Sequence, residues 1–143
     1  MKTISMLFIL GVCSFAGNTT QAQLAGFWLE DNGSLGLILD ESGYATLIID
    51  GDILFSGEGE ELADGSTGIM KYSVKYKEPY NDIDLEIQAL PDYVVMQSYK
   101  GIFVMNTDGQ MVLSCLFDND AARPTEFEPS STFILNYYDI SEE

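Results

Sequence analysis

The sequence predicts an all-β domain, a single small antiparallel barrel that follows an N-terminal export signal. Turn-forming residues, mainly Gly, Asp, Asn and Pro, recur roughly every eight to twelve residues beyond the first part of the chain. The runs between them are short and rich in Val, Ile, Tyr and Phe, which favour strands. No helix of ordinary length fits between these turns, and the best helical candidate, Glu60 to Ala63, amounts to one turn at most.

Residues 1–22 have the pattern of a signal peptide. A short positive start precedes the apolar run Ile4–Phe15, which is too short for a bilayer span of about 20 residues. Thr20 and Ala22 place small side chains at the two positions that a signal peptidase reads. We therefore expect residues 23–143 to form one exported domain, secreted or periplasmic, without a membrane span.

Lipid anchoring at Cys13 is the alternative. Cys13 ends a lipoprotein-like box that begins at Leu10. Such boxes place a small residue before the cysteine, whereas Val12 is branched and bulky. Both modes of export leave Cys115 as the only cysteine of the domain, so no internal disulfide is expected.

Ten apolar runs are the strand candidates. In chain order they cover residues 25–30, 34–40, 44–50, 53–58, 69–77, 83–89, 93–99, 101–106, 110–117 and 131–138. Gly51-Asp52 and Thr107-Asp108-Gly109 mark tight hairpins, and Pro79 to Asp82 marks another turn. Sequential hairpins favour an up-and-down order, and about eight to nine antiparallel strands with one dry face are expected to close into a barrel.

Alternation within the runs indicates which side chains face inward. The run 69–77 separates a dry face from a basic face, respectively Met70, Tyr72, Val74 and Tyr76, and Lys71, Ser73, Lys75 and Lys77. The lysine row is either a solvated outer face or a docking stripe. Cys115 shares a face with Met111, Leu113 and Phe117, so we expect a buried, unreactive thiol. Apolar residues on both sides of some runs require cover by a loop, a short helix or a second subunit.

Two stretches resemble lipocalin-like (calycin) barrels. Gly26-Phe27-Trp28 is similar to their Gly-x-Trp opening. The segment from Pro79 to Phe127 resembles a family of short lipocalin-like domains in secreted bacterial proteins, a family without a settled function. The matching residues are Pro79, Ile83, Asp84, Gly101, Ile102, Phe103, Leu113, Cys115, Arg123, Pro124 and Phe127. Tyr80-Asn81-Asp82 stretches the first part of the pattern, and Phe103 replaces an aromatic that usually carries a hydroxyl.

The resemblance implies a lipocalin-like fold and a role for the one arginine. In such barrels an arginine of the closing strands often lies across the N-terminal tryptophan, and this chain has a single residue of each kind, Arg123 and Trp28. We expect Arg123 to stack on Trp28 as a barrel-closing structural pair, or to bridge a carboxylate such as Glu126 or Asp84. An exposed loop arginine without a fixed contact is the remaining alternative.

Charge excludes several partner classes. The chain has 23 acidic and 6 basic residues and a net charge of −17. Such a surface repels phosphates, so we expect no nucleic-acid binding and no adhesion to anionic membranes. The charge either keeps the domain soluble outside the cell or presents an acidic face to a cationic partner.

The sequence lacks the residues that several kinds of catalytic, metal and phosphate-binding site require. The sequence contains no histidine, which removes the usual nucleophile–base pairs and transition-metal sites. No glycine-rich phosphate loop is present, so we expect no enzyme activity and no cofactor. Three short acidic clusters, at 50–52, 82–84 and 118–120, lack an EF-hand spacing and fit turn chemistry. Asp118 and Asp120 are the best of these weak calcium candidates.

Two functional classes remain. One is a structural or protein-interaction domain with a filled barrel. The other is a carrier or binding module for a small apolar ligand in the barrel mouth, with lining residues expected at Trp28, Tyr72, Tyr76, Phe103 and Phe117. A ligand cavity would measure roughly 300 Å³ or more, so the volume of the apolar space separates the two classes.

Overall fold

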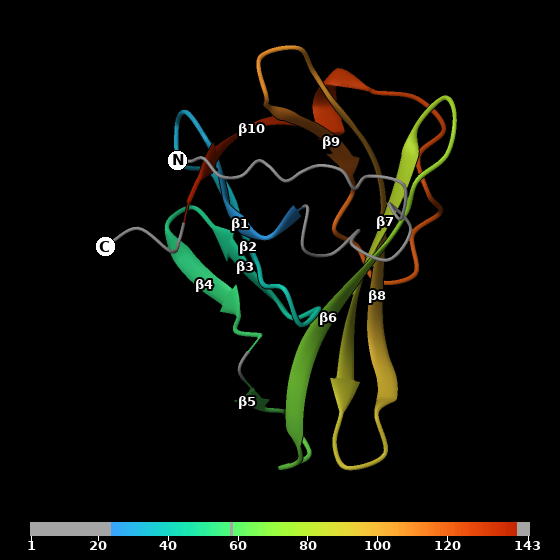
Figure 1. Cartoon of the computed structure of the whole chain (residues 1–143). Coiled ribbons are helices and arrows are strands. Elements are labelled where there is room, and N and C mark those ends of the chain that lie inside the picture. The colour runs from blue at the N-terminus through green and yellow to red at the C-terminus, as the bar shows by residue number, and fades with distance from the viewer. Residues whose placement is uncertain (1–23, 58, 140–143) are drawn as a thin grey trace.

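Figure 1 shows the computed structural model of the chain, which describes residues 24–57 and 59–139. The predicted signal segment and Cys13 lie outside the described residues. The strands are β1 (Gly26–Glu30), β2 (Leu35–Leu39), β3 (Ala45–Ile49), β4 (Asp52–Phe55), β5 (Glu60–Glu61), β6 (Thr67–Lys75), β7 (Asn81–Ala89), β8 (Val94–Met105), β9 (Met111–Cys115) and β10 (Thr132–Tyr138). A short 3-10 helix, η3 (Pro129–Ser131), precedes β10.

All these strands belong to one antiparallel sheet, which confirms the predicted all-β class. The spatial order is β4-β3-β2-β1-β10-β9-β8-β7-β6-β5, so neighbours in space are neighbours in sequence except where β1 pairs with β10. The sheet has 10 strands in the described part of the chain, instead of the expected eight to nine, and it is not closed because its end strands β4 and β5 do not pair. Among the described residues, no helix has the length and hydropathy of a membrane span.

Two local expectations were wrong. Glu60 and Glu61, which no predicted strand includes, form the two-residue strand β5, paired with Gly68 and Thr67 of β6. The predicted runs 93–99 and 101–106 are one continuous strand, β8. Gly101 does not break it: a Cβ atom there would lie 2.9 Å from the Ser114 carbonyl oxygen, so glycine allows β9 to pack closely.

The sheet curls so that the segment before β3 comes into contact with β6. We call this set of contacts the seam. Tyr44, just before β3, forms an isolated bridge with Lys71 of β6. The Tyr72 amide donates to the Gly43 carbonyl at 2.8 Å, and the Tyr72 hydroxyl donates to the Asp40 carbonyl at 2.7 Å. Below the seam, β6, β7 and β8 extend away from β3 and β4, which leaves the lower end of the molecule in Figure 1 open between them.

The concave face of the sheet holds the core. Alternate residues of β2, β7 and β9, of the middle of β6 and of the second half of β8 point inward and are buried, for example Leu37, Met70, Leu85, Phe103 and Leu113. Trp28 of β1 is 2% exposed; its indole Nε1 donates to the Leu24 carbonyl at 2.9 Å, and its ring packs 5.0 Å from the Tyr137 ring. The inward faces predicted for residues 69–77 and 110–117 match this arrangement from Met70 to Val74 and from Met111 to Phe117.

The β9–β10 connection covers part of the convex face, as expected for a sheet with apolar residues on both sides. It runs along β7 and β8 (Figure 1) and is attached to Ser98: the Ser98 amide donates to Asn119 Oδ1 at 3.0 Å, and the Asp120 amide donates to the Ser98 carbonyl at 3.1 Å. The rings of Phe127 and Tyr80 meet edge to face at 4.8 Å. Cover on this side therefore comes from the chain itself.

Gly57 packs against β3 immediately below the seam. Its amide donates to Thr46 Oγ1 at 3.0 Å, and a Cβ atom at this position would collide with the backbone of Ala45, above all its carbonyl oxygen. Only a residue without a side chain lets the segment after β4 cross so close to β3. The close crossing of this segment over β3 therefore depends on glycine at position 57.

Gly57→Ala should lower the free energy of unfolding by about 3 kcal/mol, because the added methyl group meets backbone atoms that cannot rotate away. Urea unfolding followed by circular dichroism measures the change. Gly33→Ala is the matched control: it also adds a methyl group, but no atom lies within 4 Å of it, and only the positive φ of 77° adds strain of about 1 kcal/mol. Equal losses for the two variants would contradict the packing role of Gly57.

Candidate functional site

A half-open hollow of about 370 Å³ lies at the lower end of the sheet, and we call it the mouth pocket. It is lined by Leu54, Phe55, Leu62, Ala63, Met70, Ile87, Met96, Gln97 and Tyr99. Seven of these nine side chains are apolar. The two polar ones satisfy each other, since the Tyr99 hydroxyl donates to Gln97 Oε1 at 2.7 Å. The pocket is therefore an apolar surface with little demand for polar partners.

Two register shifts shape the mouth pocket. On β4, Phe55 pairs with Leu47 and Ile53 pairs with Ile48, so Leu54 is an extra residue without a partner on β3. The same happens on β8, where Gln97 and Val95 pair with consecutive residues of β7 and Met96 is the extra residue. Bulges of this kind re-aim a side chain, and they are frequent at sheet edges and beside functional sites. Both extra residues line the pocket.

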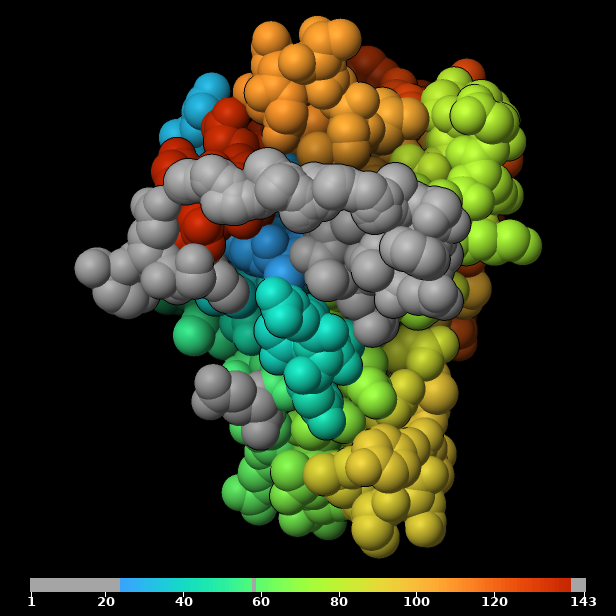
Figure 2. Space-filling model, in the orientation of Figure 1, coloured from blue at the N-terminus to red at the C-terminus, as the bar shows by residue number. Residues whose placement is uncertain are grey.

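Exposed apolar side chains surround the pocket on two sides. We define the apolar rim as Ile53, Leu54, Val94, Val95 and Met96. Ile53 is 60% exposed, Leu54 and Val94 are 54% exposed, and Met96 is 46% exposed. In Figure 2 the residues around β4 and β5 (green) and the β7–β8 hairpin (yellow) lie side by side at the lower end. Exposed apolar surfaces beside a hollow are typical of binding sites in other proteins.

The sequence did not predict this pocket. It indicated a turn at Gly51-Asp52 and no binding role for Leu54 or Met96. A signal was present in the sequence. Ile53-Leu54-Phe55 and Val94-Val95-Met96 each place three apolar residues in succession, which breaks the period of two expected for a half-buried strand.

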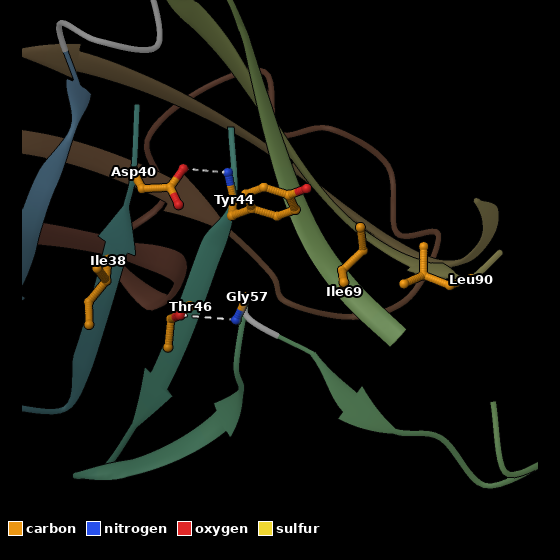
Figure 3. A pocket seen from close by; sticks show the side chains of 7 residues that line it. All are labelled: Ile38, Asp40, Tyr44, Thr46, Gly57, Ile69 and Leu90. Carbon is orange, nitrogen blue, oxygen red and sulfur yellow. Dashed lines mark hydrogen bonds between the residues drawn. The ribbon is translucent and has the colours of Figure 1, made fainter. Parts of the chain in front are cut away.

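A second hollow, of about 590 Å³, lies on the convex side across the seam, and we call it the seam cleft. Figure 3 shows its lining residues, with Ile38 and Thr46 on one side and Ile69 and Leu90 on the other. Asp40 and Gly57 complete it together with the Tyr44 ring, which points across the cleft toward β6. The cleft therefore lies between the two halves of the sheet.

Polar groups of the seam cleft hold its own walls. Asp40 Oδ1 accepts the backbone amides of Ser42 and Tyr44, both at 2.9 Å, and Thr46 Oγ1 accepts the Gly57 amide (Figure 3). The Lys71 ammonium group lies 5.5 Å from the centre of the Tyr44 ring and 5.8 Å from that of Tyr93. These contacts tie the turn before β3 to β6, which is a structural task.

Arg123 is a clamp between the β9–β10 connection and β7. Its Nη2 lies 2.8 Å from Asp84 Oδ1, and its Nε lies 3.8 Å from Asp82 Oδ1. Its Nη1 donates to the Gly101 carbonyl at 3.0 Å. Lys77 also pairs with Asp82, at 3.3 Å. A planar guanidinium can bind a carboxylate and a carbonyl at once, which an ammonium group cannot do in the same geometry.

The structure does not bring Trp28 and Arg123 together. Trp28 lies in the concave core against Tyr137, whereas the Arg123 guanidinium meets the carboxylates of Asp82 and Asp84. The contacts place Arg123 on Asp84, one of the two carboxylates expected as an alternative to stacking. The expected barrel-closing pair is therefore replaced by an ion pair that fastens a loop.

The aromatic residues expected to line a ligand site lie elsewhere. Tyr72 and Phe103 are buried in the core, and burial raises the pKa of the Tyr72 hydroxyl. Tyr76 packs edge to face on Phe103 at 6.2 Å. Phe117 lies between the rings of Tyr99 and Phe133, at 5.9 and 6.0 Å, and so reaches the mouth pocket only through Tyr99. None of these four residues lines the two hollows.

The acidic clusters serve turns and ion pairs. Asp118 accepts the Ala121 amide through its carbonyl, and Asp120 has a positive φ of 60° in the turn attached to Ser98. Asp82 and Asp84 hold Arg123. Within residues 24–57 and 59–139, no group of three or more Asp, Glu, Cys or His side chains is placed to hold a metal ion.

Cys115 points into the core beside Gly101, and burial raises the pKa of its thiol to about 11. Nearby Arg123 lowers this pKa, and Asp118 and Asp84 raise it, but both charge effects are smaller than that of burial. A thiol with so high a pKa is almost wholly protonated at neutral pH and is a weak nucleophile.

Replacing Arg123 with Lys should lower the free energy of unfolding by about 1–3 kcal/mol, because the carbonyl and carboxylate contacts cannot both be kept. Chemical unfolding measures the loss, and a double-mutant cycle with Asp84→Asn isolates the pair. Lys77→Ala is the control, since it removes a more exposed cation from the same cluster and should cost at most about 1 kcal/mol. A loss for Arg123→Lys no larger than that of the control would contradict the clamp.

Cys115 should resist thiol reagents in the folded protein. In a Cys13→Ser variant, a pKa of about 11 leaves about 0.1% thiolate at pH 8, so labelling by a disulfide reagent should be slow and should accelerate as the pH rises. Urea should expose the thiol and make labelling fast and complete. Rapid labelling of the native protein at pH 7 would show that the thiol is neither buried nor protonated.

No protein-family model, curated protein or solved structure matches this chain. The resemblance to lipocalin-like barrels therefore stays a prediction from the sequence.

Proposed function

We propose that this chain is an interaction module, not an enzyme, and that it holds an apolar side chain of a partner protein in the mouth pocket. The single observation that carries the proposal is the pair of extra residues, Leu54 and Met96, which two separate register shifts add to the same pocket. A bulge costs ladder hydrogen bonds and is kept where it positions a side chain. Two of them at one opening point to a binding role for that opening.

The apolar rim favours a protein over a small molecule as the occupant. Its side chains extend beyond the hollow onto β4 and the β7–β8 hairpin, and they are about half exposed. A small ligand inside the pocket would leave most of this surface in water. A partner that covers the rim would bury it, at roughly 25 cal/mol per Å² of apolar surface removed from water.

The second candidate is a carrier of a small apolar molecule, and the pocket volume favours it. About 370 Å³ exceeds the roughly 300 Å³ at which ligand pockets begin. The lining supports binding and not catalysis in either case, because its only polar side chains are Gln97 and Tyr99, which bond to each other. Burial also raises the pKa of the Tyr99 hydroxyl, which keeps it neutral at physiological pH.

The remaining parts of the proposal come from the sequence. We propose that residues 1–22 direct the chain to the cell exterior or the periplasm, with lipid anchoring at Cys13 as the alternative. The domain would be a lipocalin-like barrel, open along the gap between β4 and β5. The curl of the sheet and its contact at Tyr44 and Lys71 support a barrel-like arrangement.

Methyl NMR of the methionines tests the mouth pocket. On titration with a neutral leucine-rich peptide, and separately with a medium-chain alcohol, the methyl signals of Met70 and Met96 should shift, because both side chains line the pocket. Met105 is an internal control, because it is 41% exposed and does not line the pocket. Met96→Asp should abolish the shift of Met70 without unfolding the protein, since an exposed position tolerates the charge.

Tighter binding of the peptide than of the alcohol would favour the interaction module, and the reverse would favour the carrier. Equal shifts at Met105, or no shift at Met70 and Met96 with either probe, would refute a binding role for the pocket.

A further inference from the structure

The mouth pocket opens within a strongly acidic region. Residues 50–66, which supply one wall, carry six acidic residues at positions 50, 52, 58, 60, 61 and 64, and no Lys or Arg. Residues 88–97, which supply the facing wall, carry Asp92 and again no cation. Among the described acidic residues of these segments, those at 50, 52, 61, 64 and 92 are exposed.

Acidic residues of two strands and two connections are neighbours of residues that line the pocket. Asp52 is two residues from Leu54, and Glu61 and Asp64 flank Leu62 and Ala63. On the β8 side, Asp118 is near enough to Tyr99 to raise the pKa of its hydroxyl, after the larger effect of burial. Carboxylates from more than one element therefore adjoin residues that line the pocket.

The negative charge around the pocket favours some occupants of the apolar rim over others. A second copy of the chain would bring two bodies of net charge −17 together at their acidic ends. An anionic lipid surface would be repelled in the same way. A partner with positive charges beside its apolar side chain is attracted by the negative potential of this surface. The attraction speeds association and disfavours other partners.

We propose that the occupant of the mouth pocket is a basic segment of a partner protein, in which a large apolar side chain is flanked by lysine or arginine. This inference rests on the proposed function of the mouth pocket. The apolar side chain fills the hollow between Leu54 and Met96, and the flanking cations lie over Asp52, Glu61 and Asp64. The pocket supplies the contact area and the carboxylates supply the selectivity.

Three synthetic peptides test the charge preference. Each has a central leucine, flanked by lysines in the first, glutamines in the second and glutamates in the third. Fluorescence anisotropy with the purified protein should show the tightest binding for the lysine peptide and none for the glutamate peptide. Raising the salt concentration from about 25 to about 250 mM should weaken the lysine peptide about tenfold and leave the glutamine peptide nearly unchanged.

Matched variants locate the charges. The triple variant Asp52→Asn, Glu61→Gln, Asp64→Asn should weaken the lysine peptide about fivefold. The control, Asp108→Asn, Glu126→Gln, Glu128→Gln, removes the same number of charges from the β8–β9 turn and the β9–β10 connection. It should change the affinity by less than about twofold.

Failure of the two proposals can be told apart. Equal binding of all three peptides, at a site that Met96→Asp abolishes, would overturn the charge inference and keep the pocket. Binding of none of them would overturn both. Concentration-dependent dimerisation that Met96→Asp abolishes would overturn the inference in favour of a second copy.

Discussion

The two halves of the sheet meet at one backbone bridge, between Tyr44 and Lys71, and the shape of the molecule follows from where that contact ends. Above it, inward residues from both halves share one hydrophobic core that includes Leu37, Phe103 and Leu113. Below it, β4 and β5 are end strands that do not pair, so the concave face opens to solvent. The hollow at the lower end is thus what remains of the interior where the sheet is not closed.

Edge strands invite pairing with other chains, and this sheet limits that risk by length and charge. β5 has only two residues, both glutamates, and β4 has four, with a register shift inside it and Asp52 at its start. These features disfavour addition of another strand. They leave the side chains of Leu54 and its neighbours, and not the backbone edge, as the surface available for contact.

Composition and alternation were sufficient to predict the class of the fold, the inward face of β9 and the burial of Cys115, because these depend on local periodicity. They failed where a single residue alters the pairing. The runs 93–99 and 101–106 were predicted as separate strands, although they form one strand in which Gly101 packs closely on β9, and β5 was not foreseen because Glu60 and Glu61 pair with β6 through their backbones alone. The pairing of Arg123 with Asp84 was expected only as an alternative to stacking on Trp28, because the choice between them depends on the path of the β9–β10 connection, which no local pattern encodes.

Because of the two register shifts, the shape of the opening depends on the number of residues in β4 and β8. Substituting Leu54 or Met96 changes the chemistry at the opening but leaves the count of residues, and therefore the direction of each neighbouring side chain, as it is. Loss of one codon at either position would remove the extra residue and restore regular pleating, while the flanking residues keep their partners on the neighbouring strand. Relatives that differ by one residue in β4 or β8 would then share the core yet present a differently shaped entrance.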